Sequence, residues 1–230
     1  MGGFGLDGGA RGRQGARDVL RDPCAMLVFV DANLTLFAVP KTGSTAYHVS
    51  LRSRADIVMA HKGHLKHMNL RTYEQHFAPY LAQVHGLRPE RVAVMRDPLE
   101  HLRSWYRYRQ RPERKGTPRS AAGLDFDSFV LAAISDAPPT YADIGSQFAF
   151  LSSGDGGVHV EHLFAYEKLG VFHRFMEERT GRDIEVSQRN VSPGAEAPIS
   201  AQVEAQLRRA RANDFALHAR IMEAGGHLLG

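Results

Sequence analysis

The sequence predicts an α/β protein in which helices flank a central, mainly parallel β-sheet in three layers. Short apolar runs of strand type alternate with segments in which apolar residues recur every three to four positions, as in amphipathic helices. Two of the strand-type runs end in a proline-containing polar turn and pass directly into a helical segment. The chain has 230 residues, enough to bury a proper core in one domain. These observations favour a sheet covered by helices over a helical bundle.

The first 25 residues differ in composition from the rest of the chain. Met1–Gly15 contains seven glycines and two arginines, with almost no apolar residue to bury. This composition predicts a disordered tail, and it lacks the apolar segment of a secretory signal. We therefore expect a tail over residues 1–25 and a single domain over residues 26–230. Because Met26 directly precedes the first expected strand, an upstream start-site extension explains the tail equally well.

The expected elements of the N-terminal half are a β-hairpin, a helix, a short strand and a longer helical region. Their approximate bounds are Met26–Val30 and Leu34–Val39 for the hairpin strands, Thr45–Ser53 for the helix, Ile57–Met59 for the strand and Leu70–Val84 for the helical region. Pro79 is expected to kink or split that last region, because proline cannot donate the backbone hydrogen bond of a helix interior.

The expected elements of the C-terminal half are two strands and several helices. Their approximate bounds are Arg91–Met95 and Val160–Tyr166 for the strands, and Phe126–Ser135 and Leu169–Thr180 for two helices, with a further helix that begins at Pro98. A loop rich in glycine, proline and basic residues is expected over 111–123. Ser200 has the position of an N-cap for the last helical region.

The segment Pro40-Lys41-Thr42-Gly43-Ser44-Thr45 directly follows the second apolar run. The backbone N–H groups of such a turn and the positive end of the following helix converge, and Lys41 adds a full charge there. This arrangement suits a phosphate or sulfate group. It differs from the common nucleotide loop, which has a leading glycine and places its lysine after the second glycine. Here the lysine precedes the only glycine.

A second anion-binding segment is expected at the end of the strand 91–95. The sequence Arg96-Asp97-Pro98 ends this strand, and proline suits the first turn of the helix that follows. Arg96 then lies at the carboxyl end of the strand, and Ser104 lies about two helical turns further on. Each of these two side chains is able to reach a phosphate. Two anion sites at two strand ends of one sheet imply a ligand with two separated phosphates.

Together the two segments resemble the sulfotransferases that use 3′-phosphoadenosine 5′-phosphosulfate (PAPS). In that family a P-K-[TS]-[GA]-[ST]-[ST] turn binds the 5′-phosphosulfate, and an R-D/N-P-x5-S-x-Y segment binds the 3′-phosphate. This chain has residues 40–45 for the first, and Arg96-Asp97-Pro98 with Ser104 and Tyr106 for the second. Weaker similarities lie at 146–148, 164–169, 190–192 and 213–215, so the resemblance spans about Met26 to the C-terminus. The chain most resembles the compact bacterial, membrane-sulfotransferase-like branch.

The resemblance implies a P-loop NTPase-like core and in-line transfer of a sulfuryl group from PAPS to a hydroxyl or amine, with no metal required. Lys41 is expected to stabilise the bridging oxygen and the leaving phosphate. The other residues expected to bind the cofactor are Thr42, Gly43, Ser44, Thr45, Arg96 and Ser104. The acceptor is not identified by the sequence. A carbohydrate, a lipid headgroup, a peptide and a small metabolite all stay open.

Three histidines between the two motifs are candidates for the base that deprotonates the acceptor, since histidine titrates near neutrality. The resembled branch often carries a Gly-His or Lys-His pair here, and residues 63–64 and 66–67 match these pairs. His67 is preferred because it directly precedes the next helix; His64 is second and His61 third. The same three residues are also open to two other interpretations: a zinc site, if the segment is helical, or solvated loop histidines.

Other residues near the motifs have structural interpretations. His48 and His101 are expected to be polar residues on helix surfaces. Glu167 is expected to be a supporting or helix-start carboxylate rather than a base. For Tyr166 and Gln147, a position in the cleft and a role in packing are both open. For Asn190 and Ser192, contact with the nucleotide and a role in a turn are both open.

Two other functions stay open. In an ATP-dependent small-molecule kinase, a strand-end carboxylate such as Asp97 binds magnesium. Those enzymes place the lysine after the glycine, so Asp97 is expected to cap the following helix instead. The basic, aromatic-rich stretch Arg103–Arg119 resembles a nucleic-acid surface and makes a basic nucleotide- or nucleic-acid-binding module the non-enzyme alternative. No nucleic-acid motif accompanies it, so the helix is expected to hold the nucleotide. The loop fits recognition of the acceptor, an acidic one included, and ordinary solvated charge as well.

Composition is compatible with a nucleotide-binding enzyme of the cytoplasm. The net charge of +4 and the pI of about 9.4 fit a protein that binds a polyanion, and equally a generic basic surface. A single cysteine, Cys24, excludes an internal disulfide framework and suits a reducing compartment. No apolar run reaches transmembrane length, because Asp31 and Asn33 interrupt the longest one. We expect a cytoplasmic enzyme with no nucleic-acid partner.

Overall fold

The structure is a computed structural model that describes residues 25–43, 45–185 and 197–230. The tail as far as Cys24, residue Ser44 of the first motif, and the pair Asn190 and Ser192 lie outside the described residues. The expectations for them therefore stay predictions.

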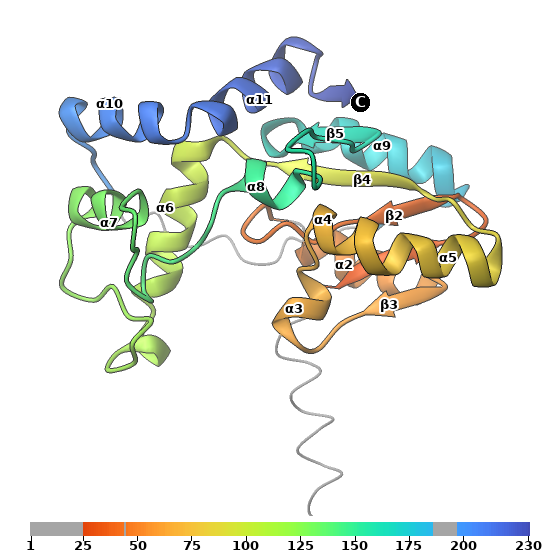
Figure 1. Cartoon of the computed structure of the whole chain (residues 1–230), viewed down its shortest axis with the longest axis horizontal. Coiled ribbons are helices and arrows are strands. Elements are labelled where there is room, and N and C mark those ends of the chain that lie inside the picture. Colours follow the sequence, from red (N-terminus) through yellow and green to blue (C-terminus); the bar gives the residue numbers. More distant parts are fainter. Residues whose placement is uncertain (1–24, 44, 186–196) are drawn as a thin grey trace, which may run out of the picture.

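Within the described part of the chain, the centre of the fold is a six-stranded sheet in the order β3-β1-β2-β4-β5-β6 (Figure 1). The strands are β1 (Met26–Phe29), β2 (Leu34–Leu36), β3 (Ile57–Met59), β4 (Glu90–Met95), β5 (His162–Ala165) and β6 (His227–Leu229). The pairs β2–β4 and β4–β5 are parallel, whereas β1–β2, β1–β3 and β5–β6 are antiparallel. The sheet is mixed, so the prediction of a mainly parallel sheet was wrong.

Short connections explain the antiparallel pairs. The predicted hairpin between β1 and β2 is confirmed, and its turn is too short for a crossover between parallel strands. Asn33 has a φ of 53° in this turn, and its N–H donates to the Val30 carbonyl at 3.0 Å. At the other edge, Gly225 and Gly226 have φ values of 77° and 97° and lead the chain back beside β5 as β6. The sequence analysis did not predict β6.

Alternate side chains of the strands enter two separate apolar cores, so the predicted three layers are present. In β4, Ala93 and Met95 belong to one core, and Val92 and Val94 belong to the other. The first core is covered by α4 (Leu70–Thr72), α5 (Ala78–His85), α8 (Gln147–Leu151) and α11 (Ala212–Glu223). The second core is covered by α2 (Thr45–Leu51) and α9 (Leu169–Thr180).

A third apolar core lies between three helices beside the sheet (Figure 1). These helices are α6 (Pro98–Arg109), α7 (Phe126–Ala133) and α10 (Ala201–Ala210). The predicted cap of α6 is confirmed, because Asp97 Oδ1 accepts hydrogen bonds from the N–H groups of Leu99 and Glu100 at 3.0 and 2.9 Å. Ser200 also caps α10 as predicted, through the N–H of Val203.

The helical region predicted over 70–84 is split, as expected from Pro79. A π-helical turn at Tyr73–Phe77 separates α4 from α5, and Pro79 lies in the first turn of α5. At that position the missing N–H has no partner to lose. The remaining short elements in the described residues are α3 (Gly63–Lys66) and three 3₁₀ turns, at Arg52–Arg54, Pro112–Arg114 and Tyr166–Lys168. None of the helices in the described residues combines the length and the apolar composition that a membrane crossing needs.

Candidate functional site

The predicted anion-binding residues follow three strands whose carboxyl ends lie at the same side of the sheet. Strands β2, β4 and β5 are parallel to one another, so their carboxyl ends lie at the same side, where open α/β sheets bind ligands. The loop at Lys41 follows β2, Arg96 follows β4 and Tyr166 follows β5. The arrangement brings two segments more than 50 residues apart in the sequence to one place.

The ring of Tyr166 lies between the two predicted motifs. The Arg96 guanidinium carbon is 4.5 Å from the ring centroid, in the geometry of a cation–π contact. On the side of the first motif, a Cβ added to Gly43 would overlap the Tyr166 ring. Gly43 and Arg96 are therefore both neighbours of a single aromatic side chain.

The first motif forms a turn with two left-handed residues. Lys41 has a φ of 64° and Gly43 a φ of 66°. The left-handed region suits glycine, whereas a lysine there is strained and is held by its surroundings. Thr42 is buried, and its hydroxyl donates to the Val39 carbonyl at 3.0 Å. The side chain of Thr42 thus holds the turn together, which leaves its backbone N–H as its expected contribution to an anion site.

His101 fastens the same turn to α6 from inside the protein. Its side chain is 6% exposed, and its Nε2 lies 3.0 Å from the Pro40 carbonyl, to which it donates. Burial, together with the charges of Arg96 and Lys41 and against the hydrogen bond to Pro40, lowers the pKa of His101 to about 4. His101 is therefore neutral at pH 7. The prediction that it lies on a helix surface was wrong, because its ring is buried between the Pro40 carbonyl and Trp105.

His48 is also buried, at 0% exposure, so the same prediction was wrong for this residue. Burial, with a smaller contribution from the neighbouring His67, lowers the pKa of His48 to about 3. This coupling indicates that α2 and the segment that contains His67 lie close together in the site region.

His67 is the candidate base that contacts the first motif. Its Nδ1 lies 2.6 Å from the carbonyl of Ala38, two residues before Pro40. A carbonyl only accepts, so Nδ1 carries the proton and Nε2 is the basic nitrogen of the neutral ring. His64 and His61 are exposed and form no hydrogen bond with another described residue. The described residues include no group of three or more His, Cys, Asp or Glu placed to hold a metal ion.

The backbone of Arg96 is held by a side chain from α8. Gln147 is 2% exposed; its Oε1 accepts from the Arg96 N–H at 3.0 Å, and its Nε2 donates to the Arg96 carbonyl at 2.8 Å. Asp214 of α11 accepts in turn from the N–H of Gln147 at 2.9 Å and from the hydroxyl of Ser146 at 2.8 Å. The C-terminal helix therefore sets the position of Arg96 through α8.

Glu167 holds the next residue of the same turn. One oxygen accepts from the N–H of Asp97 at 2.9 Å, and the other accepts from Nε2 of His218 at 3.0 Å. Burial raises the pKa of Glu167, but these two hydrogen bonds outweigh burial and lower the pKa below its ordinary value. Glu167 is thus an ionised support of the turn.

The guanidinium of Arg96 has only a loose carboxylate partner among the described residues. Its Nη2 is 3.6 Å from Glu100, which binds Arg103 more closely at 2.5 Å. Its Nε is buried without a hydrogen-bond partner in that part of the chain. Ser104 is half-buried on α6, and its hydroxyl likewise has no hydrogen-bond partner among the described residues. A bound anion would satisfy both groups.

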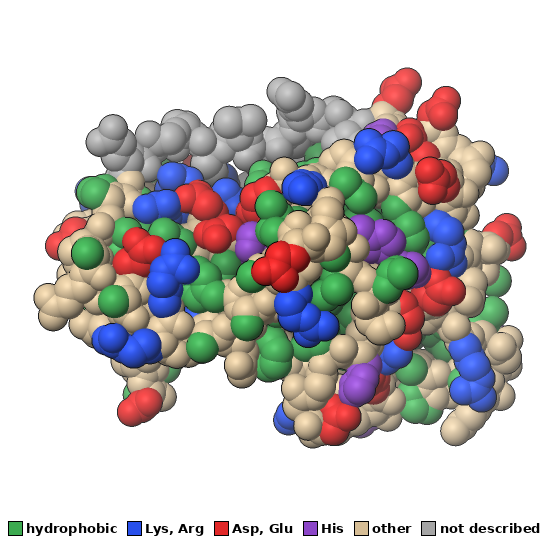
Figure 2. All heavy atoms as spheres, turned by 90° about the horizontal axis from the view of Figure 1, so that it is seen from above, with side chains coloured by type: hydrophobic (Ala, Val, Ile, Leu, Met, Phe, Trp, Pro, Cys, Tyr) green, Lys and Arg blue, Asp and Glu red, His purple; other side chains and the backbone are tan. Residues whose placement is uncertain are grey.

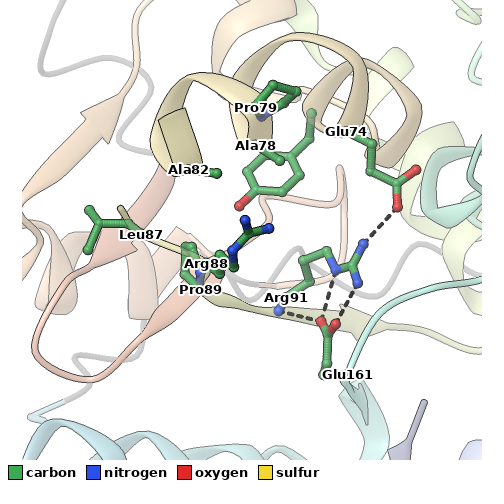
Figure 3. A pocket seen from close by; sticks show the side chains of 10 residues that line it. Glu74, Ala78, Pro79, Ala82, Leu87, Arg88, Pro89, Arg91 and Glu161 are labelled. Atoms are coloured by element: carbon green, nitrogen blue, oxygen red, sulfur yellow. Dashed lines mark hydrogen bonds and ion pairs between the residues drawn. The ribbon is translucent and has the colours of Figure 1, made fainter. Parts of the chain in front are cut away.

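A cavity of about 490 Å³ lies elsewhere, near the amino end of β4 and thus at the opposite end of the strands (Figure 3). It is lined by Tyr73, Glu74, Ala78, Pro79, Ala82, Leu87, Arg88, Pro89, Arg91 and Glu161. Arg91 is the second residue of β4, five residues before Arg96, which is about 17 Å of strand. In this cavity Arg91 is already paired with Glu74 at 2.7 Å and Glu161 at 2.5 Å. The cavity contains none of the predicted site residues.

Comparison with known proteins does not assign this chain. No model of a known protein family matches it, and no curated protein matches it.

The sequence analysis missed several residues that build this site. Tyr166 and Gln147 were left undecided, and Asp214 and His101 were given no role in the site. One signal was available for Tyr166, because it directly follows an apolar strand, as Arg96 does. The others lie inside helices, where nothing in the local sequence distinguishes a residue that supports a site from one that packs.

Proposed function

We propose that the chain is a PAPS-dependent sulfotransferase with a P-loop-like core. The observation that supports this most directly is the position of the Tyr166 ring between Gly43 and Arg96. In the resembled family, one of these segments binds the 5′-phosphosulfate and the other binds the 3′-phosphate. A single ligand with both groups is able to reach both segments only if they share one side of the sheet, as they do here.

The described residues have chemistry suited to sulfuryl transfer. An acceptor oxygen attacks sulfur, the bond from sulfur to the bridging oxygen breaks, and 3′,5′-adenosine bisphosphate leaves. Nε2 of His67 takes the acceptor proton, and Lys41 stabilises the charge that develops on the departing oxygen. Positioning and electrostatic stabilisation do most of the work in such transfers.

The positive charge of the proposed site comes mainly from side chains. α2 has only seven residues, so its dipole adds little to the field at the first motif. Lys41 and Arg96 carry full charges, and both are close enough to His101 to lower its pKa. We therefore expect these two residues to dominate nucleotide affinity, with Ser44, Thr45 and Ser104 as further ligands.

Calorimetric titration with 3′,5′-adenosine bisphosphate, and separately with ATP and Mg²⁺, tests the proposal. We expect the bisphosphate to bind and to bind more tightly than ATP. Lys41→Ala and Arg96→Ala should each weaken binding of the bisphosphate by about tenfold or more. Arg88→Ala, in the cavity at the opposite end of the strands, is the matched control and should leave the affinity unchanged. Tight ATP binding with no response to the bisphosphate would overturn the proposal in favour of a kinase.

Two observations bear on the alternatives. Asp97 Oδ1 already accepts two backbone hydrogen bonds as the cap of α6, which disfavours its use as the magnesium ligand of a kinase. Figure 2 shows basic and acidic side chains interspersed on the face viewed from above, and the described residues there form no continuous basic surface for nucleic acid. We propose a cytoplasmic bacterial enzyme whose acceptor is still to be identified.

A further inference from the structure

A group of cations surrounds one aromatic ring next to the first motif. Tyr108 lies near the end of α6, and three charged groups lie over its ring. The distances to the ring centroid are 4.5 Å for Nζ of Lys41, 4.3 Å for Cζ of Arg114 and 5.4 Å for Cζ of Arg111. Arg114 also donates a hydrogen bond to the Tyr108 hydroxyl. The loop after α6 is thereby brought to the lysine of the first motif.

A buried arginine adds to the same cluster. Arg109 is 5% exposed; its Cζ lies 5.0 Å from the Trp105 ring, which is 5.8 Å from the ring of Tyr108. Its Nε is buried and has no hydrogen-bond partner among the described residues. Burial is the main cause that lowers the pKa of Arg109, and the charges of Arg119 and Arg114 lower it further, against smaller opposite effects of Tyr108 and Asp143. Positive charges are thus close enough to repel one another.

The arginines of this cluster lie together without a carboxylate partner among the described residues, although their positive charges face two aromatic rings. Elsewhere Arg91, Arg103, Arg179 and Arg208 each lie within 2.7 Å of a glutamate oxygen. Arg109, Arg111, Arg114 and Arg119 form no ion pair with a described residue. An aromatic ring offsets cationic charge only weakly, and an oxyanion offsets it far better. An anion from outside the described residues would therefore stabilise the cluster.

We propose that this cluster, the arginine cluster of Arg109, Arg111 and Arg114 around the rings of Trp105 and Tyr108, binds an acidic group of the acceptor. The acceptor is then a hydroxyl compound that also carries a carboxylate or a sulfate. In the proposed function, the two phosphate ends of the nucleotide occupy Lys41 and Arg96, on either side of Tyr166. The arginines of the loop lie beyond Lys41, around a different ring, Tyr108. Their charge is in excess of what the nucleotide needs.

The role as acceptor site rests on the proposed function, but binding of an oxyanion at the cluster does not. Trp105 is the single tryptophan of the chain and lies in the cluster, so its fluorescence reports on ligands there. The probes are D-glucuronate for a carboxylate and D-glucose 6-sulfate for a sulfate, with D-glucose as the uncharged comparison. Each is titrated at constant ionic strength, with and without saturating 3′,5′-adenosine bisphosphate.

We expect a saturable change in fluorescence with at least one acid and none with glucose, and we expect it to persist when the bisphosphate is bound. Arg111→Gln with Arg114→Gln should weaken binding of the acid by about tenfold or more. Arg71→Gln with Arg209→Gln removes the same charge from exposed positions and should change nothing. Both arginines of the first pair lie in the loop outside the apolar cores, and a thermal melt verifies that the variant is folded.

Three results would overturn the inference: equal responses to acid and glucose, wild-type affinity in the loop variant, or displacement of the acid by the bisphosphate. The last result would assign the cluster to the nucleotide itself. If the bisphosphate fails to bind while the acid still does, the proposed function fails and the oxyanion site stands.

Discussion

Gly43 shows at the scale of one residue how the first motif depends on its surroundings. Its φ of 66° is in the region that favours glycine, and the Tyr166 ring occupies the space of a Cβ. Either reason alone would disfavour a larger residue. Together they couple the shape of the turn to the position of the ring that also contacts Arg96.

We therefore predict that Gly43→Ala weakens binding of 3′,5′-adenosine bisphosphate by about tenfold or more and lowers the free energy of unfolding by about 1–3 kcal/mol. Calorimetry and urea unfolding measure the two effects. Gly170→Ala is the control, because this helical glycine has open space around it and should tolerate alanine. Unchanged affinity in Gly43→Ala would show that the turn does not bind the nucleotide.

His67 is the residue for which protonation chemistry is expected. Once an acceptor is found, His67→Ala should lower kcat by about 10²–10⁴ and leave the affinity for the bisphosphate unchanged. His64→Ala, an exposed histidine three residues away, should retain nearly full activity. A steady-state assay together with calorimetry separates the two roles. Loss of activity in His64→Ala with full activity in His67→Ala would reassign the base.

At the scale of elements, two helices hold the turn at Arg96. α8 contributes Gln147, α11 contributes Asp214 and His218, and the turn after β5 contributes Glu167. These bonds bind the main chain rather than the guanidinium, so they fix where the charge of Arg96 starts without neutralising it. The Arg96 guanidinium is therefore held in a defined position before a ligand binds.

Replacing Gln147 tests this support. Gln147→Leu leaves the N–H and the carbonyl of Arg96 without these partners, and we predict a loss of about 1–3 kcal/mol of stability. The affinity for the bisphosphate should fall several-fold with an unchanged dependence on pH. Urea unfolding and calorimetry at two pH values measure both. Gln202→Leu, at an exposed position of α10, should have neither effect; equal behaviour of the two variants would argue against the support.

The elements that were predicted from the sequence are those with strong local signals. The hairpin, the caps at Asp97 and Ser200, and the split at Pro79 depend on residues only a few positions apart. The elements α3, α8 and β6 have three to five residues each, too few to show a period. Their existence depends on the sheet edge or the core against which each one packs.

At the scale of the whole molecule, two buried histidines make stability depend on pH. The pKa values of His48 and His101 are about 3 and about 4 in the folded protein, below the ordinary value of 6.5. As the pH falls through 6.5, the unfolded chain takes up protons that the folded chain does not. Stability is therefore fully present above pH 6.5 and declines between pH 6.5 and about 4.

As the pH falls through that range, we predict that each of the two histidines reduces the free energy of unfolding by up to about 1.4 kcal/mol per pH unit. Urea unfolding at several pH values between 7 and 4.5 measures the slope. His48→Leu should reduce it by the share of one histidine, whereas His61→Ala, at an exposed position, should leave it unchanged. An identical slope in His48→Leu and the parent protein would contradict the burial of a neutral His48.

The sequence by itself determined five of the six strands, the starts of α6 and α10 and the two motifs, because each is encoded by neighbouring residues. Only the tertiary structure decided the strand order, the mixed sheet and the contacts of Tyr166, His101 and Gln147, because these join residues tens of positions apart. A parallel and an antiparallel strand have the same apolar pattern until their neighbours are known. Two predicted motifs became one candidate site because β2, β4 and β5 run in the same direction.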